Sequence, residues 1–155
     1  MENQIGIQKD YADKMIKMLN NYLSNVQVFY MNVRGYHWNI KGKQFFNLHE
    51  KFEELYDTLN DMADEIAERV LMLDGTPIHA FSEYLKVTTI KEKVNISSAD
   101  ETVKEVLNDM KHLLKEEREI VSAASEAEDN GTVDLISGYI DSQEKLVWMY
   151  NSLLK

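Results

Sequence analysis

Residues 37–68 read HWNIKGKQFFNLHEKFEELYDTLNDMADEIAE, and this stretch holds the densest set of potential metal ligands in the chain. His49 and Glu53 are four residues apart, and so are Asp64 and Glu68, so each pair projects from one face of a helix. Glu53 and Asp64 are eleven residues apart, and at about 100° per residue their side chains point in directions that differ by only roughly 20° around the helix axis. All four side chains therefore share one stripe, and the stretch predicts a long helix that carries two half-sites for a metal ion.

The two pairs cannot bind one ion within a single chain. Fifteen residues separate His49 from Asp64, which is roughly 22 Å along a straight helix. A compact site needs a second copy of the helix running antiparallel, so that the first pair of one chain faces the second pair of its mate across a twofold axis. His37 precedes His49 by twelve residues, across a short loop that contains Gly42, and is placed to fold back as a third ligand with Trp38 bordering the site.

Histidine nitrogen combined with several carboxylate oxygens suits iron(II), although zinc or copper could compete on affinity alone. The alternative interpretation is that the acidic pairs form a solvated helix face and that the histidines are incidental. For either acidic pair considered alone, a solvated helix face is the better interpretation. Five groups placed together favour the metal site.

Apolar residues recur every three or four positions in four long segments, which is the pattern of amphipathic helices. The expected helices cover about 10–38, 48–70, 98–129 and 133–154. We therefore expect an all-α fold and a single domain of residues 1–155.

Short loops join the first two helices and the last two, so each pair is expected to pack antiparallel. Asn47 with Glu50 and Ser98 with Glu101 are candidate capping signals, and the last helix is expected to follow a break at 130–131. The segment between about 75 and 98 is too long for a tight turn, and His79 to Leu85 could form a short helix within it. Such a crossover makes the second and third long helices parallel, as in ferritin-like four-helix bundles.

Composition excludes several classes of chemistry. The chain has no cysteine, which excludes disulfides, thiolate metal sites and cysteine catalysis. It has no apolar run of about 18 residues, and MENQIGIQKDYADK lacks the features of a signal peptide, so a soluble cytoplasmic protein is expected. The formal net charge of -10 opposes long-range attraction to nucleic acid or acidic membranes and favours cations wherever the acids are focused.

The segments HWNIKG, FFNLHEKFEELY and DEIAERV, in this order and spacing, resemble the signature of the Dps family of mini-ferritins, and the resemblance covers nearly the whole chain. It implies that His37, His49 and Glu53 bind iron from one subunit and that Asp64 and Glu68 do so from the twofold mate. The family usually has aspartate at the position of Glu53, and the longer carboxylate should still reach iron.

The resemblance also implies the function and the assembly. Iron(II) would be oxidised by hydrogen peroxide, and more slowly by oxygen, and the ferric mineral stored in a hollow shell of twelve subunits that protects against oxidative stress. Trp38 is a candidate electron donor. Asp134, by its position before Trp148, matches a family aspartate of a threefold pore through which iron enters. Glu126, Glu128 and Asp129 would form the pore vestibule or, alternatively, only an acidic turn with helix-start carboxylates.

Three other functions remain open at this point. A conventional ferritin places its iron inside one bundle with Glu-x-x-His, which this chain lacks; the nearest approach is Asp109 with His112. Glu117 lies on the seam of the third long helix, where a partner for Arg118 or an interface residue is expected more than a bundle-centre iron ligand. A DNA-compacting protein would need a basic arm, whereas only Lys9 precedes the first helix, so direct DNA binding is not expected. A merely structural helical oligomer is the last alternative.

Overall fold

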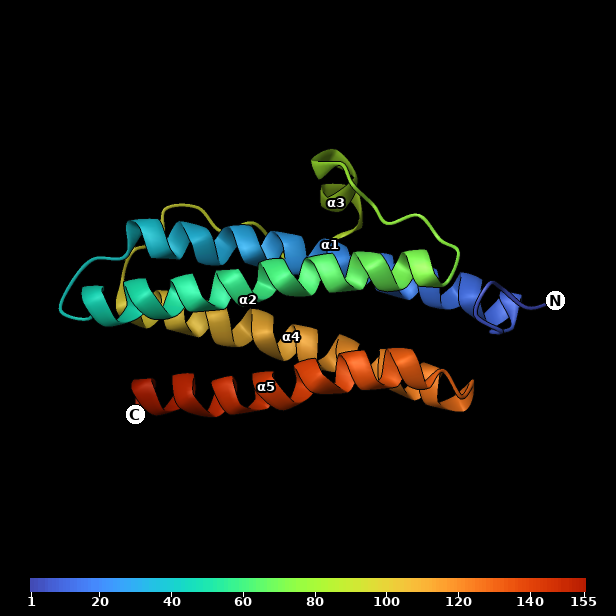
Figure 1. The fold of residues 1–155 in the computed structure, drawn as a ribbon. Coiled ribbons are helices and arrows are strands. Elements are labelled where there is room, and N and C mark those ends of the chain that lie inside the picture. The colour runs from blue at the N-terminus through green and yellow to red at the C-terminus, as the bar shows by residue number, and fades with distance from the viewer.

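The computed structural model describes residues 1–155 and contains five helices. They are α1 (Lys9–Asn39), α2 (Phe45–Met72), α3 (Phe81–Val87), α4 (Ala99–Glu126) and α5 (Asn130–Leu154). In Figure 1 the four long helices form one bundle, in which α1 runs antiparallel to α2, α4 runs antiparallel to α5, and α2 and α4 are parallel. The short α3 lies outside the bundle, over α1. The predicted all-α four-helix bundle with an extra helix in its long crossover is confirmed.

The apolar seams of the four long helices meet in one core of 30 buried residues. Leu19 and Phe29 on α1, Phe52 and Ile66 on α2 and Met110 on α4 are almost fully inaccessible to solvent. Burying a side chain of this size contributes about 1.5–3 kcal/mol to the free energy of unfolding, so these residues account for much of the stability of the helix packing.

None of the five helices combines the length and the apolar character that a membrane-spanning helix needs.

The predicted start of α4 is confirmed and the predicted start of α2 is wrong. The Ser98 hydroxyl accepts a hydrogen bond from the Glu101 N–H at 3.1 Å, as a capping box requires. Helix α2 begins two residues before Asn47, at Phe45, with Gln44 as the capping residue. No side chain bonds to the free N–H groups there. The start of α2 therefore follows from the packing of its first turn and not from a capping signal.

Two asparagines of α1, seven residues apart, hold the crossover along the bundle. The Asn25 carbonyl oxygen accepts hydrogen bonds from the Thr88 hydroxyl and the Thr89 N–H, both at 2.8 Å. The Asn32 amide donates to the Lys91 carbonyl oxygen and accepts from the Lys93 N–H, both at 2.9 Å. An extended segment without its own secondary structure thereby satisfies its backbone polar groups.

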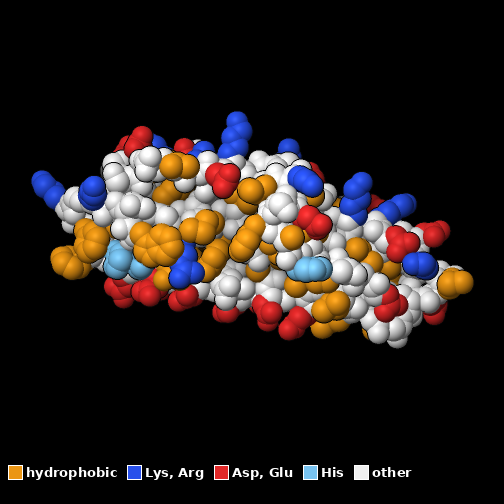
Figure 2. Space-filling model, turned by 90° about the horizontal axis from the view of Figure 1, so that it is seen from above, with side chains coloured by type: hydrophobic (Ala, Val, Ile, Leu, Met, Phe, Trp, Pro, Cys, Tyr) orange, Lys and Arg blue, Asp and Glu red, His pale blue; other side chains and the backbone are white.

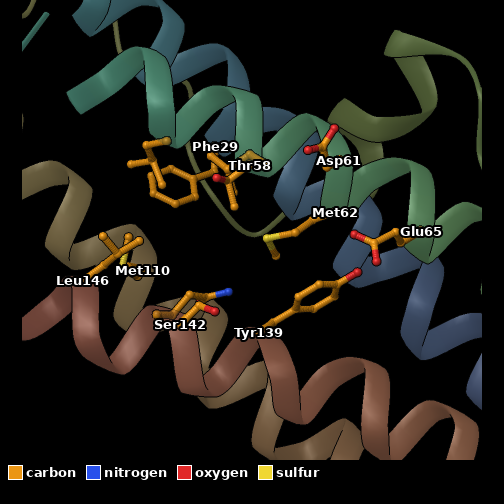
Figure 3. Close-up of a pocket in the computed structure, with 12 residues that line it drawn as sticks. Phe29, Thr58, Asp61, Met62, Glu65, Met110, Tyr139, Ser142 and Leu146 are labelled. Atoms are coloured by element: carbon orange, nitrogen blue, oxygen red, sulfur yellow. The ribbon is translucent and has the colours of Figure 1, made fainter. Parts of the chain in front are cut away.

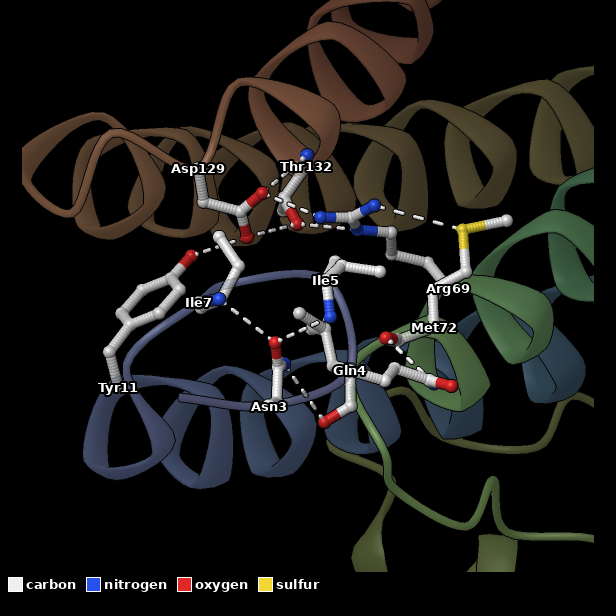
Figure 4. A network of polar contacts seen from close by, with 10 residues as sticks. Asn3, Gln4, Ile5, Ile7, Tyr11, Arg69, Met72, Asp129 and Thr132 are labelled. Carbon is white, nitrogen blue, oxygen red and sulfur yellow. Dashed lines mark hydrogen bonds and ion pairs between the residues drawn. The ribbon is translucent and has the colours of Figure 1, made fainter. Parts of the chain in front are cut away.

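A buried polar network joins the start of α5 to α1 and α2 (Figure 4). The Asp129 carboxylate caps α5 through the Thr132 N–H and hydroxyl, pairs with the Arg69 guanidinium at 2.6 Å, and accepts a hydrogen bond from the Tyr11 hydroxyl at 2.8 Å. Burial alone would raise the pKa of Asp129, but these hydrogen bonds and the Arg69 charge hold that pKa below its usual range. A Cβ atom at Gly131 would lie 2.7 Å from an Arg69 nitrogen, so a larger residue there would force the Arg69 guanidinium to move away from its present position. Helix α5 begins at Asn130 and so includes residues 130 and 131, which the sequence indicated as a break between two helices.

Candidate metal centre

The last turn of α1 and the first turns of α2 bring two histidines face to face. The rings of His37 and His49 are stacked, with centroids 3.8 Å apart. The His37 Nδ1 lies 2.6 Å from the His49 carbonyl oxygen, and the His49 Nδ1 lies 2.7 Å from the His37 carbonyl oxygen. Because a carbonyl oxygen only accepts, each Nδ1 carries the proton and donates it. When such a ring is neutral its Nε2 has a lone pair, and this is the form that binds a metal ion.

The carboxylates that the sequence assigned to the site fall into two groups. Glu53 lies on α2 one turn after His49, and its side chain is exposed. Asp64 and Glu68 are also exposed on α2, at roughly 22 Å and roughly 28 Å from His49 by helix rise. Within the single chain, no three His, Asp or Glu side chains come close enough together to hold a metal ion. Within the single chain the His37–His49 pair and the Asp64–Glu68 pair therefore lie apart, and their assignment as two half-sites stays a prediction.

An aromatic cluster next to the histidines was not predicted from the sequence. The Tyr56 ring meets the His37 ring edge-on at 5.2 Å. The Arg34 guanidinium lies 5.2 Å from the ring centres of both Tyr56 and Trp38, and 5.8 Å from that of Tyr30. The spacing of three and four residues from Arg34 to His37 and Trp38 is the signal that could have indicated this cluster. The arrangement places a cation and three electron-rich rings beside the histidine pair.

A large open groove lies over α1 and α3, and Arg34 and Trp38 of the aromatic cluster are among the residues that line it. The groove has a volume of about 970 Å³ and is lined by residues 27–39, 79–85 and 92–95 in part. The exposed apolar side chains Met31, Trp38, Phe81, Leu85 and Val94 line it. Figure 2 shows apolar side chains gathered along this face, with histidines among them and acidic side chains along one long edge. Contiguous exposed apolar surface of this kind is typical of a protein–protein interface.

The structure separates Asp129 from the other residues assigned to the iron-entry pore. Asp134 lies early in α5 and is exposed, as are Glu126 and Glu128 in the preceding turn. Asp129 is 1% exposed and its oxygens are occupied by Arg69 and the other network partners. Asp129 is thus placed to stabilise the start of α5 and not to meet a solvated ion.

Glu117 is buried at the centre of the bundle and does not pair with Arg118. The Arg118 guanidinium instead pairs with Glu144 at 3.0 Å. The Glu117 carboxylate, 0% exposed, accepts hydrogen bonds from the Tyr22 hydroxyl and, at 2.6 Å, from the Gln143 amide. Burial raises the pKa of Glu117 to about 7. The partner expected from the sequence was wrong because neighbours along a helix point to different faces.

Comparison with known proteins agrees with this architecture. The family model described as a ferritin-like domain matches residues 16–155. The DNA protection during starvation protein of Porphyromonas gingivalis is 44% identical over 95% of this chain and 92% of its own length. An uncharacterized protein of Haemophilus influenzae is 48% identical over 97% of this chain and 94% of its own length.

The similarity extends to solved structures. The crystal structure of a Dps protein from Vibrio cholerae O1, described as a member of a broad superfamily of ferritin-like diiron-carboxylate proteins, superposes with a TM-score of 0.98. It is 48% identical, over 99% of this chain and 97% of that chain. A Dps protein from Bacillus brevis gives a TM-score of 0.92 at 36% identity, over 96% of this chain and 100% of that chain. The chain therefore belongs to the ferritin-like domain family and, within it, to the Dps proteins.

Proposed function

We propose that this chain is a ferroxidase that oxidises iron(II) at a site shared between two subunits and stores the ferric product inside a hollow shell of twelve. The single observation that carries the proposal is the histidine pair. Nδ1 of His37 and of His49 is bound to a carbonyl oxygen, which leaves two metal-binding nitrogens beside the carboxylate of Glu53. Two imidazoles and a carboxylate form half of a site that suits iron(II).

The other half of the site comes from a second copy. A twofold axis that places one α2 antiparallel to another brings the partner's Asp64 and the partner's Glu68 opposite His49 and Glu53, and creates two equivalent sites. The apolar groove over α1 and α3, which Arg34 and Trp38 help to line, supports this arrangement, since a subunit interface would cover it. Carboxylates from both subunits would then stabilise the ferric product.

Hydrogen peroxide is the preferred oxidant in this proposal and oxygen the slower one. Two iron(II) ions each give one electron, and the peroxide takes both electrons with two protons and leaves as two water molecules. Because both electrons arrive together, no hydroxyl radical is released. Trp38, whose indole packs against Arg34, would supply an electron when only one iron is bound. Iron is the substrate and the stored product, and removal of iron and peroxide protects the cell from oxidative stress.

The structure offers less support for the alternatives. A conventional ferritin site would need a histidine inside the bundle, yet His112 is exposed against Thr89, and Asp109 is buried next to Asn32. The relatives are named for DNA protection, but a chain of net charge -10 does not favour contact with phosphates. We therefore propose that any protection of DNA by this protein is indirect.

An anaerobic titration of the purified protein with iron(II), followed by peroxide, tests the proposal. We expect ferric absorbance to appear in proportion to the peroxide added, at about one peroxide per two irons, and size-exclusion chromatography with light scattering to give a mass near twelve subunits. Zinc added first should suppress the reaction, because it would compete for the same nitrogens and oxygens. Iron oxidation no faster than in buffer would refute the proposed function.

A further inference from the structure

The eight methionines of the chain differ in their access to solvent. Because the chain has no cysteine, methionine is the only sulfur-containing side chain that hydrogen peroxide can modify. Met62 and Met110 line the cavity between α2 and α5 (Figure 3) and are almost fully buried. Met31, Met72 and Met149 are 49%, 47% and 46% exposed. Exposure alone therefore predicts that peroxide oxidises these last three at similar rates.

Met72 differs from Met31 and Met149 in having a cation at its sulfur atom. A terminal nitrogen of the Arg69 guanidinium lies 3.7 Å from the Met72 Sδ and donates a hydrogen bond to it. The sulfur atoms of Met31 and Met149 receive no hydrogen bond from any protein group. Met72 is therefore the half-exposed methionine at which a charged donor meets the sulfur.

The donor and the sulfur are both held in place by other contacts (Figure 4). The Arg69 Nε donates to the Thr132 hydroxyl at 3.0 Å, and the second terminal nitrogen pairs with the Asp129 carboxylate at 2.6 Å. The Gln4 amide donates to the Met72 carbonyl oxygen at 3.1 Å. The remaining guanidinium nitrogen has only the sulfur as a polar partner. Since a thioether is a weak acceptor, this nitrogen is free to donate to a better one without leaving its place.

Oxidation of the thioether supplies a better acceptor. A sulfur lone pair attacks one oxygen of hydrogen peroxide, and the O–O bond breaks. The departing hydroxide takes the proton of the oxygen now bound to sulfur and leaves as water. Sulfur loses two electrons and the peroxide gains them, so no other reactant is needed. The guanidinium N–H stabilises the negative charge that develops on the departing oxygen.

The product has room and a partner at this position. Met72 is half exposed, so the added oxygen meets no buried neighbour on its solvent side. A hydrogen bond from the Arg69 guanidinium to that oxygen is charge-assisted, and such bonds are roughly twice as strong as neutral ones. The same oxygen on the buried Met62 would have to displace packed side chains.

We propose that Met72 is a peroxide modification site, at which the sulfoxide oxygen accepts a hydrogen bond from the Arg69 guanidinium. Methionine oxidation usually disrupts packing, because it makes an apolar side chain polar. At Met72 it extends the network that joins the end of α2 to Asp129 at the start of α5. This inference goes beyond the proposed function and does not depend on it, since peroxide reacts here without iron.

Peroxide treatment of the iron-free assembled protein, followed by proteolysis and mass spectrometry, tests the proposal. The fraction of sulfoxide at each methionine is measured over time. We expect Met72 to be oxidised at least about threefold faster than in an Arg69→Lys variant, which keeps a cation for Asp129 but lacks the nitrogen at the sulfur. Met149 is the internal control and should react at the same rate in both proteins, and circular dichroism checks the fold. Equal rates at Met72 in the two proteins overturn the proposal.

Two substitutions at position 72 test the product without any oxidation, and they decide the question even where Arg69→Lys does not fold. Met72→Gln supplies a side-chain oxygen in place of the sulfoxide oxygen, whereas Met72→Leu supplies none. We expect Met72→Gln to unfold at the higher denaturant concentration. The same pair at Met149, whose sulfur has no donor, should give glutamine no advantage. If Met72→Gln is no more stable than Met72→Leu, the hydrogen bond from Arg69 to an oxygen at this position does not form.

Discussion

The Nδ1 atoms of His37 and His49 each donate to the backbone carbonyl oxygen of the other residue, at 2.6 and 2.7 Å. This reciprocal pair ties the end of α1 to the start of α2 and sets the tautomer of both rings. The Nε2 atoms are therefore oriented before any metal ion arrives. A site prepared in this way loses little entropy when iron binds.

His49→Ala or Asp64→Ala should slow peroxide-driven iron oxidation at least about tenfold, because each removes a metal ligand. The bundle should stay folded, since neither residue belongs to the apolar core. Stopped-flow absorbance of the ferric product measures the rate, and circular dichroism the fold. His112→Ala, an exposed histidine on another helix, serves as the control and should keep the normal rate.

Shells assembled from a mixture of His49→Ala chains and Asp64→Ala chains should regain peroxide-driven iron oxidation. A dimer of one His49→Ala chain and one Asp64→Ala chain has one site that keeps both residues and one that lacks both. Up to half of the sites in such a dimer should therefore work. If co-assembled shells stay as inactive as either parent, the sites are not shared across a twofold axis.

Asp134→Asn should slow iron uptake several-fold at low iron(II) concentration, because a negatively charged opening concentrates cations. Oxidation of iron already bound should keep its rate. Uptake is followed by ferric absorbance over a range of iron(II) concentrations. Asp141→Asn removes an exposed charge from the same helix and is expected to have no effect; equal behaviour of the two variants would retire the pore assignment.

Asp129→Ala should lower the free energy of unfolding by about 3–5 kcal/mol, because it leaves the Arg69 guanidinium buried without a counterion. The loss of the α5 cap adds to this effect. Denaturant unfolding followed by circular dichroism measures the change. Asp13→Ala, which breaks the exposed ion pair with Lys9, is the control and should change stability by less than about 1 kcal/mol.

The stability of the protein should fall as pH rises from about 4 to 6, in part through Asp109. Burial raises the pKa of this carboxyl from 3.8 to about 6, against the hydrogen bond from Asn32. The folded chain therefore keeps a proton that the unfolded chain has released within this window, and the free energy of unfolding decreases with pH. Above the window the loss is at most roughly 3 kcal/mol for Asp109 alone.

Asp109→Asn should remove this part of the pH dependence. At pH 7 the variant should be more stable than the original chain, whereas near pH 4 the two should be alike. Denaturant midpoints measured at several pH values test this expectation. Asp141→Asn, an exposed acid, should leave the slope unchanged, and an unaltered slope in Asp109→Asn would contradict the assignment.

The protein should not bind duplex DNA appreciably at about 0.15 M salt, because affinity for DNA rests on cations that neutralise phosphates. Each chain carries a net charge of -10, and twelve copies would multiply it, although part of that charge would face the interior. A mobility-shift titration with the iron-free shell measures the affinity. A sub-micromolar complex would overturn this expectation.

Most of the bundle could be predicted from sequence because helices are encoded by local spacing. Apolar residues at intervals of three and four defined the four long helices, and the capping box at Ser98 defined the start of α4. The same periodicity placed His49, Glu53, Asp64 and Glu68 on one stripe and showed that they cannot meet within one chain. These features depend only on the geometry of a single helix.

Other features depend on which helices meet, and only the tertiary structure decides them. The sequence left open whether Asp129 lies at a pore or at the start of a helix; it caps α5, and Arg69, sixty residues away along the chain, binds it in a buried ion pair. Glu117 meets Tyr22 of α1 and Gln143 of α5, and Arg34 lies between aromatic rings of α1 and α2. Periodicity shows which side of a helix faces inward, but the position and crossing of neighbouring helices determine the contacts made there. For this reason the stripe of candidate metal ligands could be predicted from the sequence, whereas the buried contacts of Asp129 and Glu117 could not.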